Sequence, residues 1–167
     1  MLFYDFEVFP YDWLVVIIDA EKKKEHVFVN DEQSLIEFYN QHKNDIWVGY
    51  NSRHYDQYIL KAIIAGFPPQ EINDWIINQK RLGWEFYEGF WKIKLYNFDI
   101  MTDRNRSLKQ LEGFMGHDIR ETTISFDTDR KLTNEEIQEV IKYCRHDVQE
   151  TMHIFAENIH EFTSHLE

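Results

Sequence analysis

The chain has few of the features that mark a secreted or membrane-inserted protein. Its 167 residues include one cysteine, Cys144, which has no partner for an internal disulfide. No apolar stretch approaches the roughly 20 residues that cross a bilayer, because even residues 13–18 lie between Asp12 and Asp19. No basic segment precedes the first apolar residues, as it would in a signal peptide. These absences argue against membrane insertion and predict a location in the cytoplasm.

Basic residues are also scarce. The chain has 18 Lys and Arg residues against 30 Asp and Glu residues, a formal net charge of −12 at pH 7. Proteins that bind nucleic acid through a general basic surface neutralise phosphates with such residues, so the composition argues against that class. A site for divalent cations is itself acidic, and two bound ions return about four positive charges where a phosphate lies. The charge is therefore compatible with metal-assisted chemistry on phosphates.

The length predicts one domain, residues 1–167. A chain of 167 residues, 43% of them hydrophobic, is long enough to close one sizeable core and too short for two ordinary domains. The sequence contains no internal repeat, low-complexity segment or linker. We therefore expect a single globular domain.

Hydrophobic periodicity predicts an α/β fold with a mixed five-stranded sheet and helices on both faces. Short apolar and β-branched runs predict strands, first as a three-stranded antiparallel meander and then as parallel additions, at residues 2–8, 13–19, 25–30, 46–49 and 94–100. Amphipathic patterns with caps and stop signals predict helices at residues 31–42, 54–65, 70–80, 107–115 and 134–160. Thr133 and Glu136 form a capping-box pattern before the last helix. The segments 81–90 and 118–130 lack clear periodicity, and the second is predicted to be a loop.

Two carboxylates, Asp5 and Glu7, lie two residues apart within the first apolar strand. Positions i and i+2 of a strand share a face. Burying two like charges side by side is unfavourable unless cations or hydrogen-bond donors compensate them, and a divalent metal is the simplest compensation. The alternative is an edge strand with a hydrated polar face, and this pair alone does not decide between the two.

Two further segments carry candidate functional residues. Asn51 and Asp56 follow the strand 46–49, near its C-terminal end, where open α/β sheets bind ligands. Asp56 could instead stabilise its own helix through the dipole. Tyr143 and Asp147 lie at positions i and i+4 of the last helix, on one face, and the alternative there is an exposed turn with a packed tyrosine.

Taken together, the three segments predict a two-metal hydrolytic site. Asp5, Glu7, Asp56 and Asp147 could surround one phosphate through two ions roughly 3.5–4 Å apart. One ion would lower the pKa of the attacking water, and the other would stabilise the leaving 3′-oxygen. Tyr143 would orient that water, since a phenol with a pKa near 10 is a poor base at neutral pH.

Three spacings resemble the exonuclease motifs of the DEDD superfamily in its tyrosine-bearing (DEDDy) branch: Asp5-x-Glu7, Asn51-x-x-x-Tyr55-Asp56 and Tyr143-x-x-x-Asp147. The match extends over nearly the whole chain and looks most similar to proofreading domains of phage family B DNA polymerases. The resemblance implies a ribonuclease-H-like fold, two Mg²⁺ or Mn²⁺ ions, and release of nucleoside 5′-monophosphates from the 3′ end of single-stranded DNA. It also implies contacts of Asn51 and Tyr55 with the terminal nucleotide.

The sequence departs from the family pattern at two positions. Val8 stands where many relatives have a threonine, so the backbone of Val8 could bind the terminal nucleotide but its side chain could not donate a hydrogen bond. Phe6 is a further candidate for contact with that nucleotide. Lys142 stands where the histidine branch has its base, which favours the tyrosine branch. A phage origin, action in the host cytoplasm and a replication polymerase or other replisome protein as partner follow from the resemblance alone. An exoribonuclease, a non-catalytic nucleic-acid-binding module and a nucleotide hydrolase remain alternatives.

The remaining polar and aromatic clusters are weaker candidates. His146, His153 and His160 recur every seven residues, whereas helical metal pairs use spacings of three or four. An aromatic group is expected to pack as a hydrophobic hairpin, with base stacking as the alternative: Trp84, Phe86, Tyr87, Phe90 and Trp91. Several basic residues are expected to be surface charges or to line a groove for an incoming strand: Arg81, Arg104, Arg106, Arg130 and Lys131. Asp99 and Asp103 are expected to cap turns.

Overall fold

Five strands form one mixed sheet in the computed structural model, which describes residues 1–101 and 123–158. The antiparallel strands are β1 (Leu2–Val8), β2 (Trp13–Asp19) and β3 (Lys24–Val29), and two parallel strands follow, β4 (Ile46–Gly49) and β5 (Tyr96–Asp99). Their spatial order is β3-β2-β1-β4-β5. The first strand of the chain is therefore the middle strand of the sheet, between an antiparallel and a parallel neighbour.

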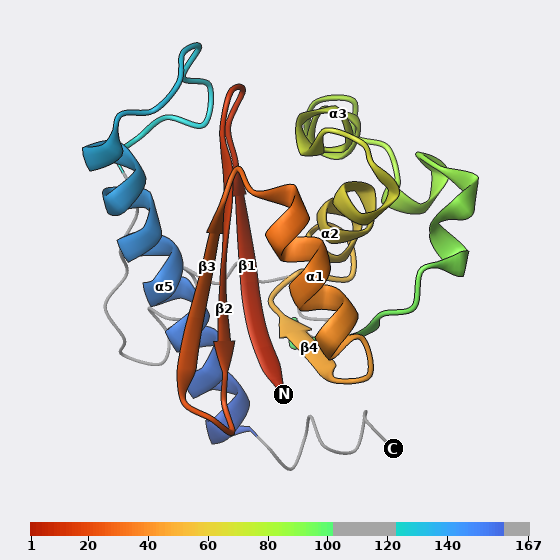
Figure 1. The fold of residues 1–167 in the computed structure, drawn as a ribbon, viewed down its shortest axis with the longest axis vertical. Helices are drawn as coiled ribbons and strands as arrows, with labels where there is room; N and C mark the ends of the chain where they lie inside the picture. Colours follow the sequence, from red (N-terminus) through yellow and green to blue (C-terminus); the bar gives the residue numbers. More distant parts are fainter. Residues whose placement is uncertain (102–122, 159–167) are drawn as a thin grey trace.

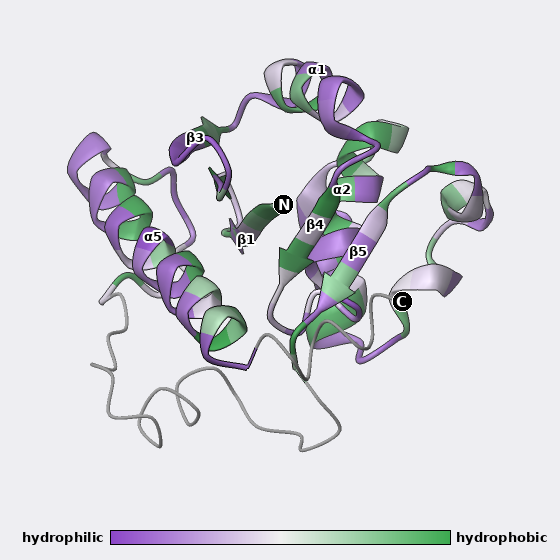
Figure 2. Ribbon diagram, turned by 90° about the horizontal axis from the view of Figure 1, so that it is seen from below, coloured by the Kyte–Doolittle hydropathy of each residue, from purple (hydrophilic) through white to green (hydrophobic). Residues whose placement is uncertain are grey.

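Helices cover both faces of this sheet (Figure 1). On one face lie α1 (Glu32–His42), α2 (Asp56–Ala65) and α3 (Pro69–Asn73), and on the other lies α5 (Asn134–Glu157). Figure 2 shows α5 with its hydrophobic residues turned toward the sheet. The predicted α/β class and five-stranded mixed sheet are confirmed. Among the described residues, no helix combines the length and the apolar character that a membrane crossing requires.

The side chains of β1 alternate between two hydrophobic cores. Leu2, Tyr4, Phe6 and Val8 pack into the core beneath α1 and α2. Phe3 belongs to the core beneath α5, where its ring meets that of Phe155 edge-on at 5.5 Å. Because side chains of a strand point to opposite faces in turn, the carboxylates at positions 5 and 7 also lie on the face that α5 covers.

The start of α5 is fixed by a buried carboxylate in the β1–β2 hairpin. Asp12 is 2% exposed. One of its oxygens accepts a hydrogen bond from the Leu132 backbone N–H at 2.8 Å, and the other accepts one from the Asn30 side chain at 2.8 Å. The predicted capping box is confirmed, since Thr133 and Glu136 exchange hydrogen bonds of 2.9 and 3.1 Å. Asp12 therefore joins the β1–β2 hairpin to the start of α5.

Several predicted boundaries differ from the structure. The segment predicted as one helix over residues 70–80 is α3 followed by a π-helical turn, η1 (Asp74–Asn78). The Asp74 side chain accepts hydrogen bonds from Asn78 and Gln79, and its carbonyl accepts the Gln79 N–H, which widens this turn. The predicted helix 54–65 begins only at Asp56. The predicted strand 94–100 is shortened to β5, and the last helix ends at Glu157.

The hairpin predicted for the aromatic region is wrong. Residues 83–92 form two 3₁₀ turns, η2 (Gly83–Glu85) and η3 (Glu88–Lys92), because Phe86 and Phe90 turn inward against α2 instead of pairing as strands. Residues 123–130 are a loop, as predicted, and Arg130 within it pairs with Glu136. The predicted helix 107–115, the predicted loop residues 118–122 and three single residues lie outside the described part of the chain: Asp103, Arg104 and Arg106. His160 lies outside it as well.

Replacing Asp12 by alanine tests the join between hairpin and helix. Asp12→Ala leaves the buried Leu132 N–H without an acceptor, so we expect it to lower the free energy of unfolding by about 3 kcal/mol. Asp31 supplies a control, because its carboxylate is exposed and accepts the Ser34 N–H at the start of α1. Asp31→Ala should cost about 1 kcal/mol. Urea denaturation measures both, and equal losses would contradict the role given to Asp12.

Candidate functional site

Three potential ligand groups meet beneath α5. The carboxylates of Asp5 and Glu7 and the thiol of Cys144 offer ligand atoms that all lie within 4.8 Å of one another. The Cys144 sulfur lies 3.3 Å from the Asp5 carbonyl oxygen and 3.5 Å from an oxygen of its carboxylate. Since α5 packs directly on β1 at this point, the thiol donates toward Asp5 and links the helix to the strand.

Asp56 reaches β1 from the opposite layer of the fold. Its carboxylate accepts the Phe6 backbone N–H at 2.9 Å, between the two acidic positions of the strand. The side chain is 3% exposed. Asp56 does lie in the first turn of α2, as the helix-dipole alternative requires. Its side chain also contacts the central strand directly, at the residue between Asp5 and Glu7.

The loop between β4 and α2 holds Asp56 in this position. The Asp99 carboxylate, at the end of β5, accepts backbone N–H groups of Asn51 at 2.8 Å and Arg53 at 3.0 Å. Gly49 allows this loop to fold back, because a Cβ atom there would lie 2.6 Å from that of Ser52. The turn-capping role predicted for Asp99 is confirmed, and the loop joins the two parallel strands at their C-terminal ends.

The four predicted carboxylates influence one another electrostatically. Burial, followed by the negative charges of Asp5, Asp147 and Asp56, raises the pKa of Glu7 well above its ordinary value. Burial and the charge of Asp5 likewise raise the pKa of Asp56. Interactions of this kind weaken with distance. We refer to Asp5, Glu7, Asp56 and Asp147, which come from β1, α2 and α5, as the acidic cluster; within it, Asp5 and Glu7 have ligand atoms within 4.8 Å of each other.

Tyr143 lies one helical turn before Asp147 on α5, and both side chains are half-buried. Within the described part of the chain, the Tyr143 hydroxyl makes no hydrogen bond to the protein. A phenol of this kind is available to a water molecule or a ligand.

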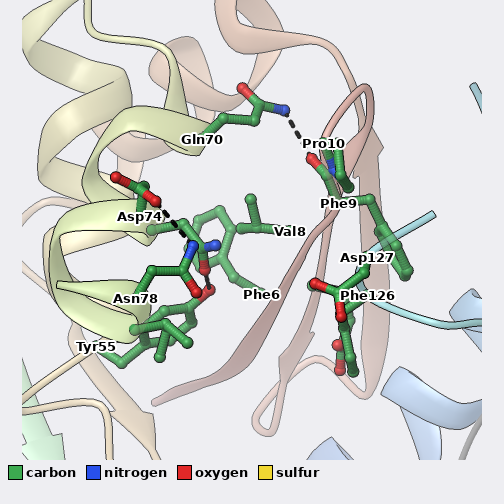
Figure 3. A pocket seen from close by; sticks show the side chains of 13 residues that line it. Phe6, Val8, Phe9, Pro10, Tyr55, Gln70, Asp74, Asn78, Phe126 and Asp127 are labelled. Carbon is green, nitrogen blue, oxygen red and sulfur yellow. Dashed lines mark hydrogen bonds between the residues drawn. The ribbon is translucent and has the colours of Figure 1, made fainter. Parts of the chain in front are cut away.

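A cavity of about 580 Å³ opens beside the cluster. Figure 3 shows its two walls, one formed by α3 and η1 and the other by the β1–β2 hairpin with Phe126 and Asp127. Glu7 belongs to the acidic cluster and also lines this cavity. The volume lies within the range of sites for small organic ligands, roughly 300–1,000 Å³. A molecule in the cavity would therefore lie against the Glu7 carboxylate.

Three of the four predicted substrate-binding residues line this cavity: Phe6, Val8 and Tyr55. Asn51 is not among its lining residues. It is exposed, has a left-handed backbone with φ of 58°, and donates its N–H to Asp99. An asparagine suits such a backbone conformation, so the structure gives Asn51 a role in the loop that holds Asp56.

Sequence reasoning overlooked the residues that support the site. Asn73 accepts the Tyr55 hydroxyl at 2.6 Å and holds that ring in the cavity wall. Phe126 stacks on Phe9 at 5.0 Å between ring centres and closes the opposite wall. No pattern in the sequence indicates the contacts of Asn73 or Phe126. Cys144 does have such a pattern, since it lies three residues before Asp147 on the helix and so projects toward the same side.

The donor set suits a hard divalent cation. Four carboxylates are the ligands that Mg²⁺ and Mn²⁺ prefer, and positive charge would relieve the repulsion that raises the pKa of Glu7 and Asp56. Burial and the charges of Asp5, Glu7 and Asp147 raise the pKa of the Cys144 thiol. The thiol therefore stays protonated at neutral pH and acts as a hydrogen-bond donor instead of a thiolate ligand.

No protein-family model matches this chain, and no curated protein matches it in sequence.

Removing one negative charge should stabilise the metal-free protein. The raised pKa of Glu7 means that the folded state binds a proton more readily than the unfolded state, so stability in chelator should fall as the pH rises above the ordinary value of 4.5. At pH 7 we expect Glu7→Gln to raise the free energy of unfolding by about 1–2 kcal/mol. Exposed Glu37 on α1 is the control, and Glu37→Gln should change nothing. Urea denaturation in chelator at pH 5 and pH 7 measures both, and a destabilised Glu7→Gln would refute the repulsion.

Proposed function

We propose that this protein is a metal-dependent 3′→5′ exonuclease of the DEDDy type that shortens single-stranded DNA from its 3′ end. The observation that carries the proposal is the acidic cluster of Asp5, Glu7, Asp56 and Asp147, of which Glu7 lines a cavity of about 580 Å³. The strand order β3-β2-β1-β4-β5, with helices on both faces, is compatible with a ribonuclease-H-like fold.

In this proposal the four carboxylates hold two divalent cations, Mg²⁺ or Mn²⁺. When bound, such ions lower the pKa of a water molecule and stabilise the charge on the leaving oxygen. The chain's own residues set the geometry. The Phe6 N–H fixes the Asp56 carboxylate at 2.9 Å, and Cys144 donates toward Asp5, so two of the carboxylates are oriented before any ligand arrives.

The terminal nucleotide would occupy the cavity beside Glu7. The apolar side chains of Phe6 and Val8 suit a base or sugar face, and the Tyr55 ring is held by Asn73 at the same wall. The cavity volume of about 580 Å³ lies in the range of sites for small organic ligands, which is compatible with one unpaired nucleotide. Tyr143 would orient the attacking water from α5, because its hydroxyl has no competing hydrogen bond within the described residues.

The motifs also suggest that the protein acts in DNA replication. We propose a replication polymerase or another replisome protein as the partner, in the cytoplasm of a phage-infected host, with this chain acting as a domain, a subunit or a free-standing nuclease. This part of the proposal rests on the resemblance of the motifs to proofreading domains of phage family B polymerases.

Incubation of 3′- and 5′-labelled strands with the protein tests the activity. With Mg²⁺ or Mn²⁺ we expect a ladder of products shortened from the 3′ end of single-stranded DNA and release of nucleoside 5′-monophosphates. Chelator, Asp5→Ala and Asp147→Ala should each abolish turnover, and both variants should keep the wild-type circular dichroism spectrum.

Matched RNA strands, duplexes and free nucleotides separate the alternatives in the same assay. Preferred trimming of RNA would replace the proposal by an exoribonuclease, and hydrolysis of free nucleotides without trimming would replace it by a nucleotide hydrolase. Strand binding without any product would leave a non-catalytic module.

Tyr143→Phe separates water positioning from metal binding. The variant keeps the ring and loses only the hydroxyl, so we expect kcat to fall by about 10- to 100-fold while calorimetric titration with Mn²⁺ gives an unchanged affinity. Asp147→Ala is the matched comparison on the same helix face, and its Mn²⁺ affinity should fall. An unchanged kcat in Tyr143→Phe would remove the tyrosine from the mechanism.

A further inference from the structure

Positive charge concentrates in one segment of this acidic chain. Residues 80–96, which we name the aromatic–basic segment, contain four basic and two acidic residues, a net charge of +2 in a chain of −12. The same 17 residues contain six aromatic side chains, Trp84, Phe86, Tyr87, Phe90, Trp91 and Tyr96. Figure 1 draws the segment beside α2, on the side of the molecule away from α5.

The aromatic rings of this segment are divided into an inner and an outer set. Phe86 and Phe90 face the core, and their rings stack at 6.2 Å. Tyr87, Trp84 and Trp91 lie outside them, with 40%, 51% and 77% of their surface exposed. A soluble domain rarely leaves several large rings exposed together without a binding partner.

The outer rings stand on a rigid support. Tyr87 contacts Phe67 at 5.1 Å and Phe90 at 5.4 Å, both edge-on. A side chain on Gly89 would collide with the Tyr87 ring, since its Cβ atom would lie 2.5 Å away, so the backbone of η3 passes directly against that ring. Rigid rings lose little conformational entropy on binding, so such a surface suits ligands with flat faces.

Cations lie directly beside the exposed rings. The Lys92 ammonium is 5.5 Å from the centre of the Trp91 ring, and the Lys94 ammonium is 5.1 Å from that of Tyr96. The guanidinium of Arg81 lies 4.4 Å from the Trp75 ring. Alternating rings and cations match a single strand of nucleic acid, whose flat bases stack on rings while its phosphates require positive charge.

The segment is firmly joined to the wall of the cavity beside the acidic cluster. The Trp75 indole, within η1, donates to the Leu82 carbonyl at 2.9 Å, and its ring meets that of Phe86 at 5.6 Å. Ile77 and Asn78 of the same η1 turn line the cavity. A strand bound to the aromatic–basic segment is therefore bound to the same rigid part of the protein that forms the cavity wall.

We infer that the aromatic–basic segment is a second nucleic-acid contact, which binds unpaired bases of single-stranded DNA on Trp84, Tyr87 and Trp91 and its phosphates on Lys92 and Lys94. Stacking and charge supply the binding, and catalysis has no part in it. The choice of DNA over RNA rests on the proposed function. A protein partner fits less well, because interface centres are depleted of lysine, whereas lysines flank these rings.

Equilibrium binding of fluorescein-labelled dT20 in chelator tests the inference without any turnover. Trp91→Leu removes the ring and keeps an apolar side chain, so we expect the Kd to rise about tenfold. Trp91→Phe keeps a ring and should raise the Kd less than about threefold. The double variant Lys92→Gln/Lys94→Gln should reduce the slope of log Kd against log salt by about 0.7 per lysine that contacts a phosphate.

Lys22→Gln is the matched charge control, because Lys22 is exposed in the turn between β2 and β3, and β3 is the edge strand opposite β5. Its salt slope should equal that of the wild type. Unchanged affinity in Trp91→Leu, or equal losses in Trp91→Leu and Trp91→Phe, would overturn the inference, because stacking predicts a larger loss when the ring is absent. A tenfold preference for rU20 would overturn the choice of DNA. Binding with these properties in a protein that never trims strands would refute the proposed function and leave this inference standing.

Discussion

Repulsion between carboxylates on the middle strand is the constraint on which the rest of the structure depends. Asp5 and Glu7 share one face of β1, where burial and nearby negative charge raise the pKa of Glu7. An arrangement of this kind weakens the fold unless cations enter it. Other contacts therefore have to stabilise the packing of the helices on the sheet. Among them are hydrogen bonds at the ends of the elements that supply the acidic side chains.

Each of those elements is tied to the sheet by a hydrogen bond that the hydrophobic cores cannot provide. Asp12 binds the start of α5, and Arg145 pairs with Glu25 of β3 further along the same helix. Asp99 holds the loop before α2, and Asp56 accepts the Phe6 N–H. Hydrogen bonds require a defined distance and direction, so these contacts add positional constraints to those of hydrophobic packing. Their effect is to fix the relative positions of carboxylates from three distant segments.

The aromatic–basic segment differs from the acidic cluster in that its charged side chains are exposed to solvent. Its inner rings stabilise the fold beneath α2, while its outer rings and lysines remain in solvent. Both regions are joined by Trp75 and the turn η1, which forms the wall of the cavity. If the two proposals hold, a chain of net charge −12 would approach phosphates where positive charge is available, through lysines at one place and through cations held by carboxylates at the other.

Local patterns in the sequence were enough to predict the strands, most of the described helices and the shared strand face of Asp5 and Glu7, because periodicity, capping and the spacing of these two residues are local properties. The π-helical turn at Asp74, the 3₁₀ turns in place of a hairpin, the absence of Asn51 from the cavity lining, and the contacts of Asp12, Asn73 and Cys144 became visible only in the folded chain. These depend on partners up to 139 residues away in the chain. A local pattern shows which groups a segment offers, but the packing of the layers determines which of them meet.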